Sequence, residues 1–424
     1  MTISEIDRYN KTGQKAEAGD TRRTIVYIGG FELPDKNAAA QRVITNAQIF
    51  QKLGYRVLLV GLSKNRQANG HLYPAESGES GLEAWEMGYP SNQVNWLRQI
   101  LSDAPLRKLI LLTDIANLHT VICYNHPAVS QWRIAHLARQ HGALAVADCT
   151  EWYSKRHWGS VSGIVKNLDV MLRMHYVNWR MDGLITTSPF ISGFYRSSRK
   201  PIVEIPTLMA PNRTEQTPIV DRSNGITRLF FAGTGFDKAS ASESADGMKD
   251  RLDWVFDVLH RAKLLGARFH MDLYGVDLDQ YRELVPEQVT ILDDMQDDLS
   301  FHGRQPRKLL LETLPKAAFS IFFRKETRTN LAGFPGKLSE SISYGTPVIT
   351  NPMPSSSQYL IEQQTCHLVE ITDFDKAAAK IVELFAQSDS QVNAMKSYCY
   401  NSKVFHYQSF ISPVEDWLYA LEAS

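Results

Sequence analysis

The stretch Thr24–Gly61, TIVYIGGFELPDKNAAAQRVITNAQIFQKLGYRVLLVG, decides the fold class. It opens with a β-rich apolar run, Thr24–Ile28, which ends in the turn Gly29-Gly30. Apolar residues then recur at helical spacing over Asn37–Leu53, and Arg56–Gly61 is a second predicted strand. Strand, glycine turn, helix and strand in this order predict the start of a parallel α/β sheet.

The same alternation continues along the chain and predicts two such sheets. It runs to Pro201–Ile205, gives way to a polar, proline-containing stretch, and restarts at Arg228–Ala232. We therefore expect five segments: a flexible tail over 1–22, an N-terminal Rossmann-like domain over 23–207, a linker over 208–227, a C-terminal Rossmann-like domain over 228–405 and a closing helix over 406–424. Ligands of open parallel sheets bind beyond the carboxyl ends of the strands. Two doubly wound domains facing a cleft would place the site in that cleft.

Composition and charge exclude several classes of protein. The 424 residues contain 46 Lys and Arg against 46 Asp and Glu, so no nucleic-acid partner is expected. The cysteines are widely spaced without a CxxC pair, which argues against a zinc site or disulfides and fits a reducing cytoplasm. The start is polar, and no apolar run approaches the roughly 18 residues of a membrane-spanning helix. Contact with a membrane surface stays open.

The segment Thr329–Asn351, TNLAGFPGKLSESISYGTPVITN, is the most informative for chemistry. Its glycine- and proline-rich loop opens a predicted helix that carries Lys337 and Glu340. Backbone N–H groups at a helix start suit an anion, and Lys337 adds a positive charge there. Glu340 lies one turn further on the same face and could accept hydrogen bonds from ribose hydroxyls. A surface ion pair between the two side chains explains the spacing equally well.

This segment resembles the donor-binding motif of retaining, nucleotide-sugar-dependent glycosyltransferases with the GT-B fold, a group that includes bacterial enzymes of surface-polysaccharide synthesis. Gly333-Phe334, Glu340 and Gly345–Ile349 match the motif, and Phe334–Lys337 resembles the Phe-Pro-Thr-Lys loop of one subgroup. The first Glu of the motif is Ala332 here, which bears on recognition of the donor sugar. Asn330 is a candidate substitute.

The resemblance extends upstream to a phosphate segment. Phe231–Gly235, which includes the candidate donor-binding residues Gly233, Thr234 and Gly235, resembles the glycine loop after the first strand of the second domain. Thr234 stands where the family has Arg, and residues 236–248 are inserted. Lys249 at the next helix start suits a pyrophosphate, with Arg251 as a stand-in for the missing cation. A solvated lysine is the alternative.

Two further arginines complete the predicted donor site. Phe301–Arg304 resembles the loop that lies against the nucleotide base, which makes Arg304 a candidate. Phe323-Arg324 resembles a Leu-Arg step of the Phe-Pro-Thr-Lys subgroup. Arg324 would either face the phosphates or hold the neighbouring loop.

In the first half, Asn125-His126-Pro127 follows the predicted strand Val121–Tyr124. The family has an active-site histidine at the end of this strand, and His126 matches it by position. The resemblance implies that His126 contacts the sugar, although His-Pro is also a common turn. At the first turn, Gly29 and Gly30 either allow close approach of a sugar or phosphate, or simply make the turn.

Asp148 and Glu151 follow the next predicted strand, Leu144–Ala147. Carboxylates at strand ends face the expected cleft, so both are candidate catalytic residues that bind acceptor hydroxyls. A helix cap made by Asp148 or Thr150 is the alternative.

A basic stretch from Trp152 to Lys200 contains eight Lys or Arg and only two Asp. Aromatic residues are interleaved with the charges: Trp152, Tyr153, Trp158, Tyr176 and Trp179. This composition fits a peripheral contact with an anionic membrane or with a lipid pyrophosphate. Aromatic residues at helical spacing also fit a core.

The resemblance implies a retaining hexosyltransferase without metal or cofactor. It would move a sugar from a nucleoside diphosphate sugar to a hydroxyl of a glycan or lipid-linked acceptor. The setting would be surface-polysaccharide synthesis, in the cytoplasm or at the inner face of the membrane. Lys249 and Lys337 would stabilise the diphosphate leaving group. A nucleotide-sugar epimerase and, because of Ala332 and Thr234, a non-catalytic partner protein on the same scaffold are alternatives. The last helix of such proteins commonly crosses back to the first domain.

Overall fold

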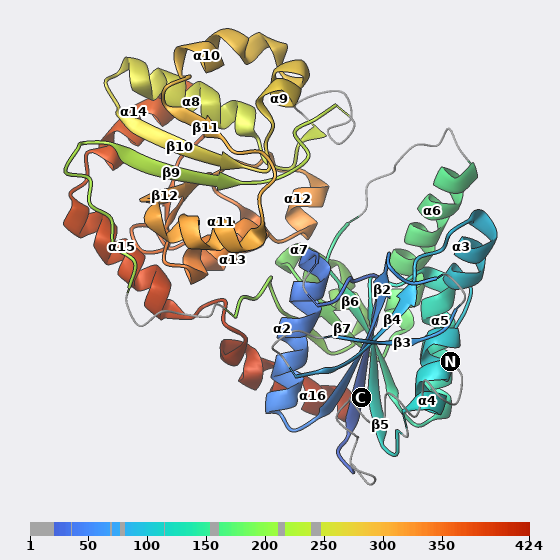
Figure 1. Ribbon diagram of the computed structural model, residues 1–424. Coiled ribbons are helices and arrows are strands. Elements are labelled where there is room, and N and C mark those ends of the chain that lie inside the picture. Colours follow the sequence, from blue (N-terminus) through green and yellow to red (C-terminus); the bar gives the residue numbers. More distant parts are fainter. Residues whose placement is uncertain are drawn as a thin grey trace. The chain divides into compact units, whose positions relative to one another are not determined.

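The computed structural model describes residues 21–34, 36–67, 70–76, 81–113, 115–152, 161–210, 217–238 and 247–424 (Figure 1). The chain divides into two compact units. The first unit comprises Met1–Leu208 with Tyr407–Ser424, and the second unit comprises Met209–His406. Most of the predicted tail, Tyr153, Trp158 and part of the predicted insertion lie outside the described residues.

The first unit is built on a sheet of eight strands in the order β3-β4-β2-β1-β5-β6-β7-β8. Their bounds are β1 (Thr24–Gly29), β2 (Arg56–Ser63), β3 (Tyr73–Ala75), β4 (Glu83–Gly88), β5 (Leu118–Tyr124), β6 (Leu144–Cys149), β7 (Gly183–Thr186) and β8 (Ile202–Glu204). All neighbours pair in parallel except the edge strand β3, which is antiparallel to β4. β1 is buried along its whole length, as expected for a parallel strand covered on both faces.

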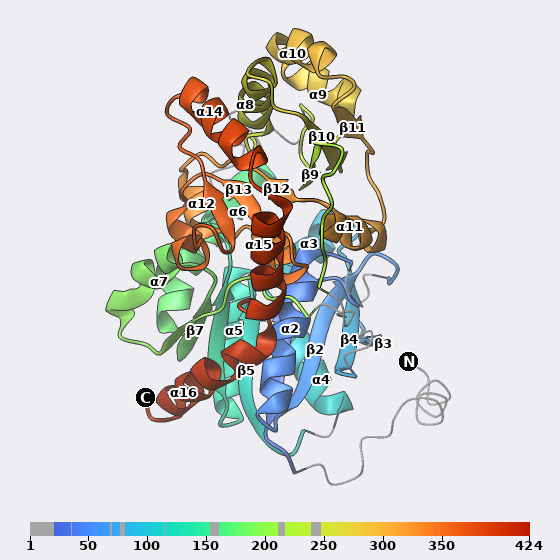
Figure 2. The ribbon, with the colours of Figure 1, turned by 90° about the vertical axis from the view of Figure 1, so that its left-hand side faces the viewer.

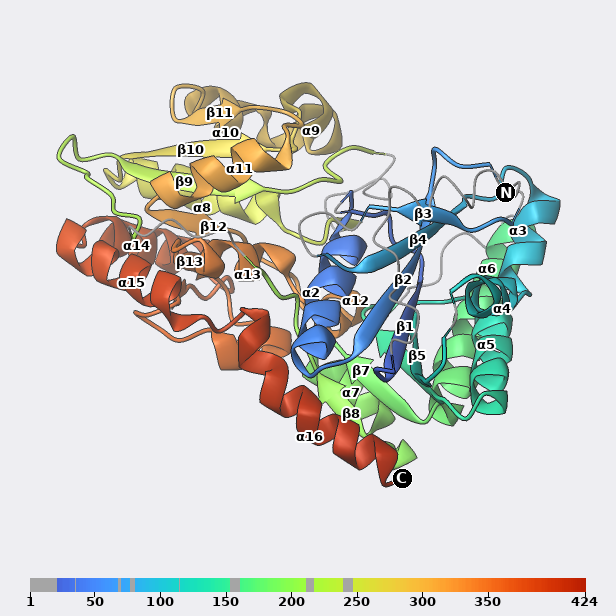
Figure 3. The same cartoon turned by 60° about the horizontal axis from the view of Figure 1, so that its bottom comes forward.

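Helices cover both faces of this sheet (Figure 3). On one face lie α2 (Ala38–Lys52) and α16 (Ile411–Glu422), and on the other lie α3 (Gln93–Ile100), α4 (Ala104–Leu112), α5 (Ala128–Gln140) and α6 (Val161–Leu172). The short helix α7 (Pro189–Tyr195) precedes β8. The Asn37 side chain caps α2 by accepting a hydrogen bond from the Ala40 N–H, 2.9 Å away.

The closing helix α16 packs on the first unit. Its apolar stripe, Val414, Trp417, Leu418 and Leu421, is buried in the same core as β1 and β2. The Trp417 Nε1–H donates to the Pro201 carbonyl over 3.2 Å. The helical spacing of these residues therefore corresponds to a buried face in the structure.

The second unit is a sheet of six parallel strands in the order β11-β10-β9-β12-β13-β14. The strands are β9 (Thr227–Ala232), β10 (Phe269–Tyr274), β11 (Leu299–Phe301), β12 (Phe319–Ile321), β13 (Val348–Thr350) and β14 (Cys366–Leu368). The helices are α8 (Leu252–Leu264), α9 (Leu278–Leu284), α10 (Val289–Asp294), α11 (Arg307–Thr313), α12 (Arg328–Ala332), α13 (Gly336–Ser343), α14 (Phe374–Phe385) and α15 (Asp389–Ser402). Helices α8 and α14 lie side by side (Figures 1 and 2). The order of strands reverses between β9 and β12, which makes this the switch point of a doubly wound sheet.

Two Rossmann-like parallel-sheet units confirm the predicted fold class. The linker was predicted over residues 208–227. Residues 217–227 form hydrogen bonds and an ion pair with the second unit, so this part belongs to that unit. The Val220 N–H donates to the Asn393 side chain over 2.8 Å, and Arg222 forms an ion pair with Asp389 at 2.8 Å.

Candidate functional site

A buried carboxylate organises the switch point of the second unit. Asp250 lies just before α8 and accepts hydrogen bonds from two cations. Lys337 Nζ is 2.7 Å from one carboxylate oxygen, and Arg324 Nε is 2.7 Å from the other. The three side chains are only 11–13% exposed. Lys337 Nζ also lies 4.0 Å from the ring centroid of Phe231, a favourable cation–π contact at the end of β9.

Burial and the neighbouring charges shift the pKa values of Asp250 and Lys337 in opposite directions. Burial by itself raises the pKa of Asp250, but Arg324 and Lys337 outweigh it and hold that pKa well below its ordinary value. Burial lowers the pKa of Lys337, and Asp250 opposes this by favouring the charged amine. Two cations share one carboxylate, so the cluster keeps an excess of positive charge.

The local sequence explains why Lys337 needs Asp250. Helix α13 begins at Gly336, directly after Pro335, so Lys337 lies in its first turn. A cation there is opposed by the positive end of the helix dipole. The Asp250 carboxylate offsets this cost. The Asn351 side chain holds the backbone of Arg324 by accepting from its N–H over 2.8 Å and donating to its carbonyl over 2.9 Å.

Glu340 has a different partner from the one that its spacing suggests. Its carboxylate lies 2.8 Å from Arg307 Nη2 on α11, whereas Lys337 pairs with Asp250. The surface pair between Lys337 and Glu340 is therefore not formed. Burial raises the pKa of Glu340, and Arg307 and Lys337 oppose that rise. Glu340 and Lys337 both belong to α13, so the helix brings these two predicted residues together.

The glycine loop after β9 folds tightly against the next strand. The Gly233 N–H donates to the Tyr274 carbonyl over 3.0 Å. A Cβ on Gly275 would come within 2.0 Å of the Gly233 carbonyl oxygen, so Gly275 permits this approach. Gly235 has φ +89°, where glycine is favoured, and Thr234 lies between these glycines. A Cβ on Gly233 would lie 2.9 Å from the Phe231 ring, so close packing explains Gly233 and the backbone conformation explains Gly235.

Asn330 and Arg251 have structural partners. The Asn330 amide donates to the carbonyls of Lys249 (3.1 Å) and Lys325 (2.9 Å) and joins two loops. The amide nitrogen of Asn330 is thus engaged in holding these loops, and its part as a substitute for the missing Glu stays a prediction. Arg251 is buried, pairs with Asp253 and lies 4.2 Å over the Trp254 ring. The structure thus contradicts the prediction of Arg251 as a phosphate-binding cation.

The remaining predicted donor residues, Lys249 and Arg304, are exposed. Arg304 follows a stacked pair that sequence reasoning missed. The His302 ring lies 4.5 Å from the Tyr274 ring with an interplanar angle of 15°, and its Nε2 is 2.7 Å from the Asp272 carboxylate. An aromatic platform beside the β9 loop suits a flat ligand group such as a base. Tyr274 ends β10, a position that the strand pattern alone could have indicated.

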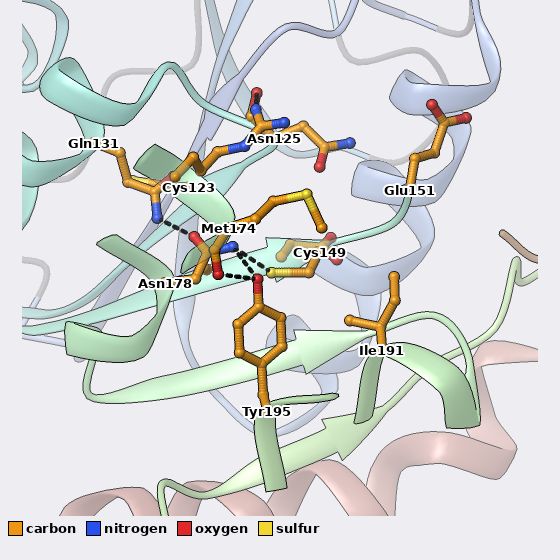
Figure 4. A pocket seen from close by; sticks show the side chains of 12 residues that line it. Cys123, Asn125, Gln131, Cys149, Glu151, Met174, Asn178, Ile191 and Tyr195 are labelled. Carbon is orange, nitrogen blue, oxygen red and sulfur yellow. Dashed lines mark hydrogen bonds between the residues drawn. The ribbon is translucent and has the colours of Figure 1, made fainter. Parts of the chain in front are cut away.

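In the first unit, a small pocket lies among the ends of β5 and β6 and the π-helix η2 (Arg173–Val177) (Figure 4). Hydrogen bonds join its walls: Gln131 donates to Asn178 over 2.8 Å, and Asn178 donates to the Tyr195 hydroxyl over 2.9 Å. Figure 4 shows the Glu151 carboxylate directed away from this network.

Asp148 is among the residues that line that pocket, and its side chain is fully buried. It forms a buried ion pair with Arg42 at 2.8 Å and accepts a short hydrogen bond from the Tyr27 hydroxyl. Arg42 also donates to the carbonyls of Ile205 (2.7 Å) and Pro206 (3.0 Å). Asp148 caps no helix among the described residues. Its carboxylate is engaged by Arg42 and Tyr27, and the prediction that it binds an acceptor hydroxyl stays a prediction.

His126 is also buried, at the carboxyl end of β5. Its Nε2 lies 2.9 Å from the Ser130 hydroxyl, and that hydroxyl donates to the Ser102 carbonyl. Because Ser130 has one proton, Nε2 must donate, which leaves Nδ1 as a buried acceptor with no partner among the described residues. Burial, followed by the charge of Arg173, lowers the pKa of His126 to about 4, so the ring is neutral at physiological pH.

The two glycines of the first turn differ. A Cβ on Gly29 would lie 2.4 Å from the Tyr124 carbonyl oxygen, so Gly29 is needed for the pairing of β1 with β5. A Cβ on Gly30 would meet open space. The structure thus explains Gly29 by strand packing and leaves Gly30 available to a ligand.

Within the described part of the chain, no group of three or more His, Cys, Asp or Glu side chains could hold a metal ion. A search of the same residues finds no helix with the length and apolar character needed to cross a bilayer.

Two doubly wound parallel-sheet units are the architecture of the GT-B fold, which this chain shares with solved glycosyltransferase structures. Residues 239–387 match the family model of the glycosyl transferases group 1. No curated protein matches the chain.

Solved structures with this architecture cover nearly the whole chain. The catalytic domain of starch synthase IV from Arabidopsis thaliana, bound to ADP and acarbose, is 11% identical with a TM-score of 0.64 and covers 95% of this chain and 100% of its own. Sucrose-phosphate synthase from Thermosynechococcus elongatus is 13% identical with a TM-score of 0.60 and the same coverage. The Anabaena protein HepE, in complex with UDP and glucose, is 10% identical with a TM-score of 0.58 and covers 94% of this chain and 100% of its own. Likeness at these identities establishes the fold.

Proposed function

We propose that the protein is a retaining glycosyltransferase that moves a hexose from a nucleoside diphosphate sugar to a hydroxyl of a glycan or lipid-linked acceptor. The match of residues 239–387 to the group 1 family model supports the class of reaction. The observation that carries the proposal is the cluster of Lys337 and Arg324 around Asp250, at the switch point where doubly wound sheets bind ligands. Its excess of positive charge and the start of α13 suit a diphosphate.

Negative charge develops on the diphosphate as the bond to the sugar breaks. Lys337 and Arg324 are held in place before the ligand arrives, so they stabilise that charge without a large reorganisation. Lys249, which precedes Asp250 and is exposed, supplies a further cation from the same segment. These side chains take the part that a metal ion plays in other transferases, in line with the metal independence that the resemblance implies.

Glu340 would bind the donor ribose. Arg307 engages one of its carboxylate oxygens, Oε1, and this orients the group while Oε2 stays available to accept from ribose hydroxyls. Retention of configuration would follow the route that the resemblance implies, in which a leaving phosphate oxygen takes the acceptor proton. Asp148 and Glu151, at the end of β6, are the predicted carboxylates for an acceptor hydroxyl. Surface polysaccharide is the class of product that the resemblance favours.

Calorimetry with nucleoside diphosphates and a product assay test the proposal. Replacing Lys337→Ala should weaken diphosphate binding by about 1.5–3 kcal/mol, the contribution of a hydrogen bond to a charged group. The matched control is Lys376→Ala, which removes an exposed lysine on α14. Equal affinities in the two variants would remove Lys337 from the site.

The anomer of the product, read by NMR with a donor of known configuration, tests retention. Ala332 is fully buried where the family motif has Glu, an observation that favours the non-catalytic partner as the second candidate. Donor binding without turnover on any acceptor would decide for that candidate. Conversion of the donor sugar in the absence of an acceptor would decide for an epimerase.

A further inference from the structure

One helical layer of the first unit exposes a continuous apolar stripe. Ile164, Leu168 and Leu172 recur at intervals of four residues along α6, and Tyr176 continues them in η2. Leu168 is 56% exposed, and the neighbouring Met171 is 50% exposed. Residues four apart share one helix face, so these side chains form a single outward-facing stripe.

The neighbouring helices extend this surface. Helix α3 has no buried residue and exposes Val94 and Leu97. Both α3 and α6 pack against α5, and Trp132 of α5 lies 5.7 Å from the Tyr176 ring. Figure 3 shows these helices on the same side of the sheet. Most of the exposed large apolar side chains among the described residues belong to this layer, whereas α2 on the opposite face contributes none.

Basic residues outnumber acidic ones in this layer, although the chain as a whole is balanced. Two of the basic side chains are paired with flanking acids, Arg107 with Asp103 at 2.8 Å and Arg139 with Asp182 at 2.9 Å. Helices α3, α4, α5 and α6 contain six basic residues, namely Arg98, Arg107, Lys108, Arg133, Arg139 and Lys166. Their one acidic residue is Asp169, whose carboxylate accepts from the Ala128 N–H at 2.8 Å and is thus directed toward the start of α5. Arg180 adds a cation 4.4 Å over the Tyr176 ring.

We infer that this layer docks on the surface of an anionic lipid bilayer. A bilayer interface takes up apolar side chains and the cationic ends of Lys and Arg along one plane, which is the combination found here. Each cation near an anionic leaflet strengthens binding, and each apolar side chain that enters the boundary adds to it. The inference goes beyond the proposed function, since it rests on the first unit and requires no ligand in the second.

The structure also relocates the membrane contact that the sequence suggests. Trp152 and Trp179 both make edge-to-face contacts with Phe194, at 4.9 and 5.7 Å between ring centroids, and so belong to a packed aromatic cluster. The surface available to lipid is therefore mainly the aliphatic stripe of α6, with Lys166 beside it.

Flotation of the full chain with vesicles tests this inference. We expect binding to vesicles that contain roughly 30 mol% phosphatidylglycerol and little binding to phosphatidylcholine alone, with loss at high salt. The double variant Leu168→Glu/Met171→Glu should lower the partition coefficient about tenfold or more, because two apolar side chains become charged. Lys166→Glu should lower it several-fold. The matched control, Leu264→Glu/Leu265→Glu at the C-terminal end of α8, changes two exposed leucines of the second unit and should bind as the wild type does.

Circular dichroism and nucleoside diphosphate binding verify that each variant is folded. Absence of binding to anionic vesicles by the wild type would overturn the inference, as would an equal loss in both double variants. Light scattering measures the molar mass of the protein and so tests whether a second copy of the chain, rather than a bilayer, covers this layer. A dimer that Leu168→Glu/Met171→Glu dissociates, without vesicle binding by the wild type, would assign this layer to a second copy of the chain.

Discussion

Replacing Asp250→Asn removes the charge that holds two cations of the proposed donor site while keeping the shape of the side chain. Both ion pairs, to Lys337 and to Arg324, are 2.7 Å long and largely buried. Removing one partner from a buried pair costs about 3–5 kcal/mol, because the other charge stays uncompensated. A domain of this size loses about 2–4 °C of melting temperature per kcal/mol, so the second unit should melt roughly 6–20 °C lower.

A diphosphate should repair this loss. In the variant, Lys337 and Arg324 lack their carboxylate, and the ligand supplies the missing negative charge. A ligand that binds the native state raises the melting temperature according to its affinity and concentration. We therefore expect nucleoside diphosphate to raise the melting temperature of Asp250→Asn by more than it raises that of the wild type.

Differential scanning fluorimetry with a ligand titration measures both effects. The control variant Glu383→Gln removes one side of an exposed pair with Lys380 on α14, which is worth at most about 1 kcal/mol. An unchanged melting temperature for Asp250→Asn would show that the carboxylate does not hold the two cations. A ligand shift no larger than in the wild type would show that the cations do not face the diphosphate.

Three further predictions concern other parts of the chain. Glu340→Gln should raise the KM for the donor while the fold survives; a variant that instead unfolds near the assay temperature would make Glu340 a structural residue of α13. Lys396 is fully buried and donates to the Pro315 and Ala317 carbonyls at 3.0 and 2.8 Å, and burial lowers its pKa to about 7. Between about pH 7 and about pH 10.4, the unfolded chain therefore binds a proton at Lys396 that the folded chain has released. The free energy of unfolding should rise with pH from about 7 to about 10.4. Urea titrations of Lys396→Met should show a flatter rise than those of the wild type. Deleting the chain from Ser412 onward removes the buried stripe of α16, and each large residue of this stripe contributes roughly 1.5–3 kcal/mol to stability. Hydrogen exchange should show lost protection over residues 24–206. Unaltered protection there would contradict the packing of α16 on the first unit.

The regular alternation of strands and helices determined the fold class at the level of the sequence. Runs such as Thr24–Ile28 and Phe319–Phe323 are mainly apolar and do not alternate with charged residues, because strands of a parallel sheet are covered on both faces. Short edge strands lack this signal. β3 and β4 fall in a stretch with Glu, Pro and Gly, and this composition is typical of loops.

The segment Thr329–Asn351 also indicated where a donor site would lie. Arg324 follows β12, and Lys337 and Glu340 belong to α13, which begins in the connection between β12 and β13. The sequence could not indicate which charge pairs with which. Asp250 is 87 residues from Lys337 and 74 from Arg324, and it belonged to a segment in which only its neighbours were expected to bind phosphate.

In the first unit, the same limit applies to Asp148, which the sequence predicts to be a catalytic carboxylate. Its position after β6 is a local property that the sequence displays, whereas its partner Arg42 lies 106 residues away on α2. Periodicity and turn residues are set by contacts within a few residues, so they can be read from the chain alone. The charge state of a side chain depends on its burial and on the charged groups around it, and many of those groups are distant in the sequence. Only the tertiary structure shows which partners each predicted residue has.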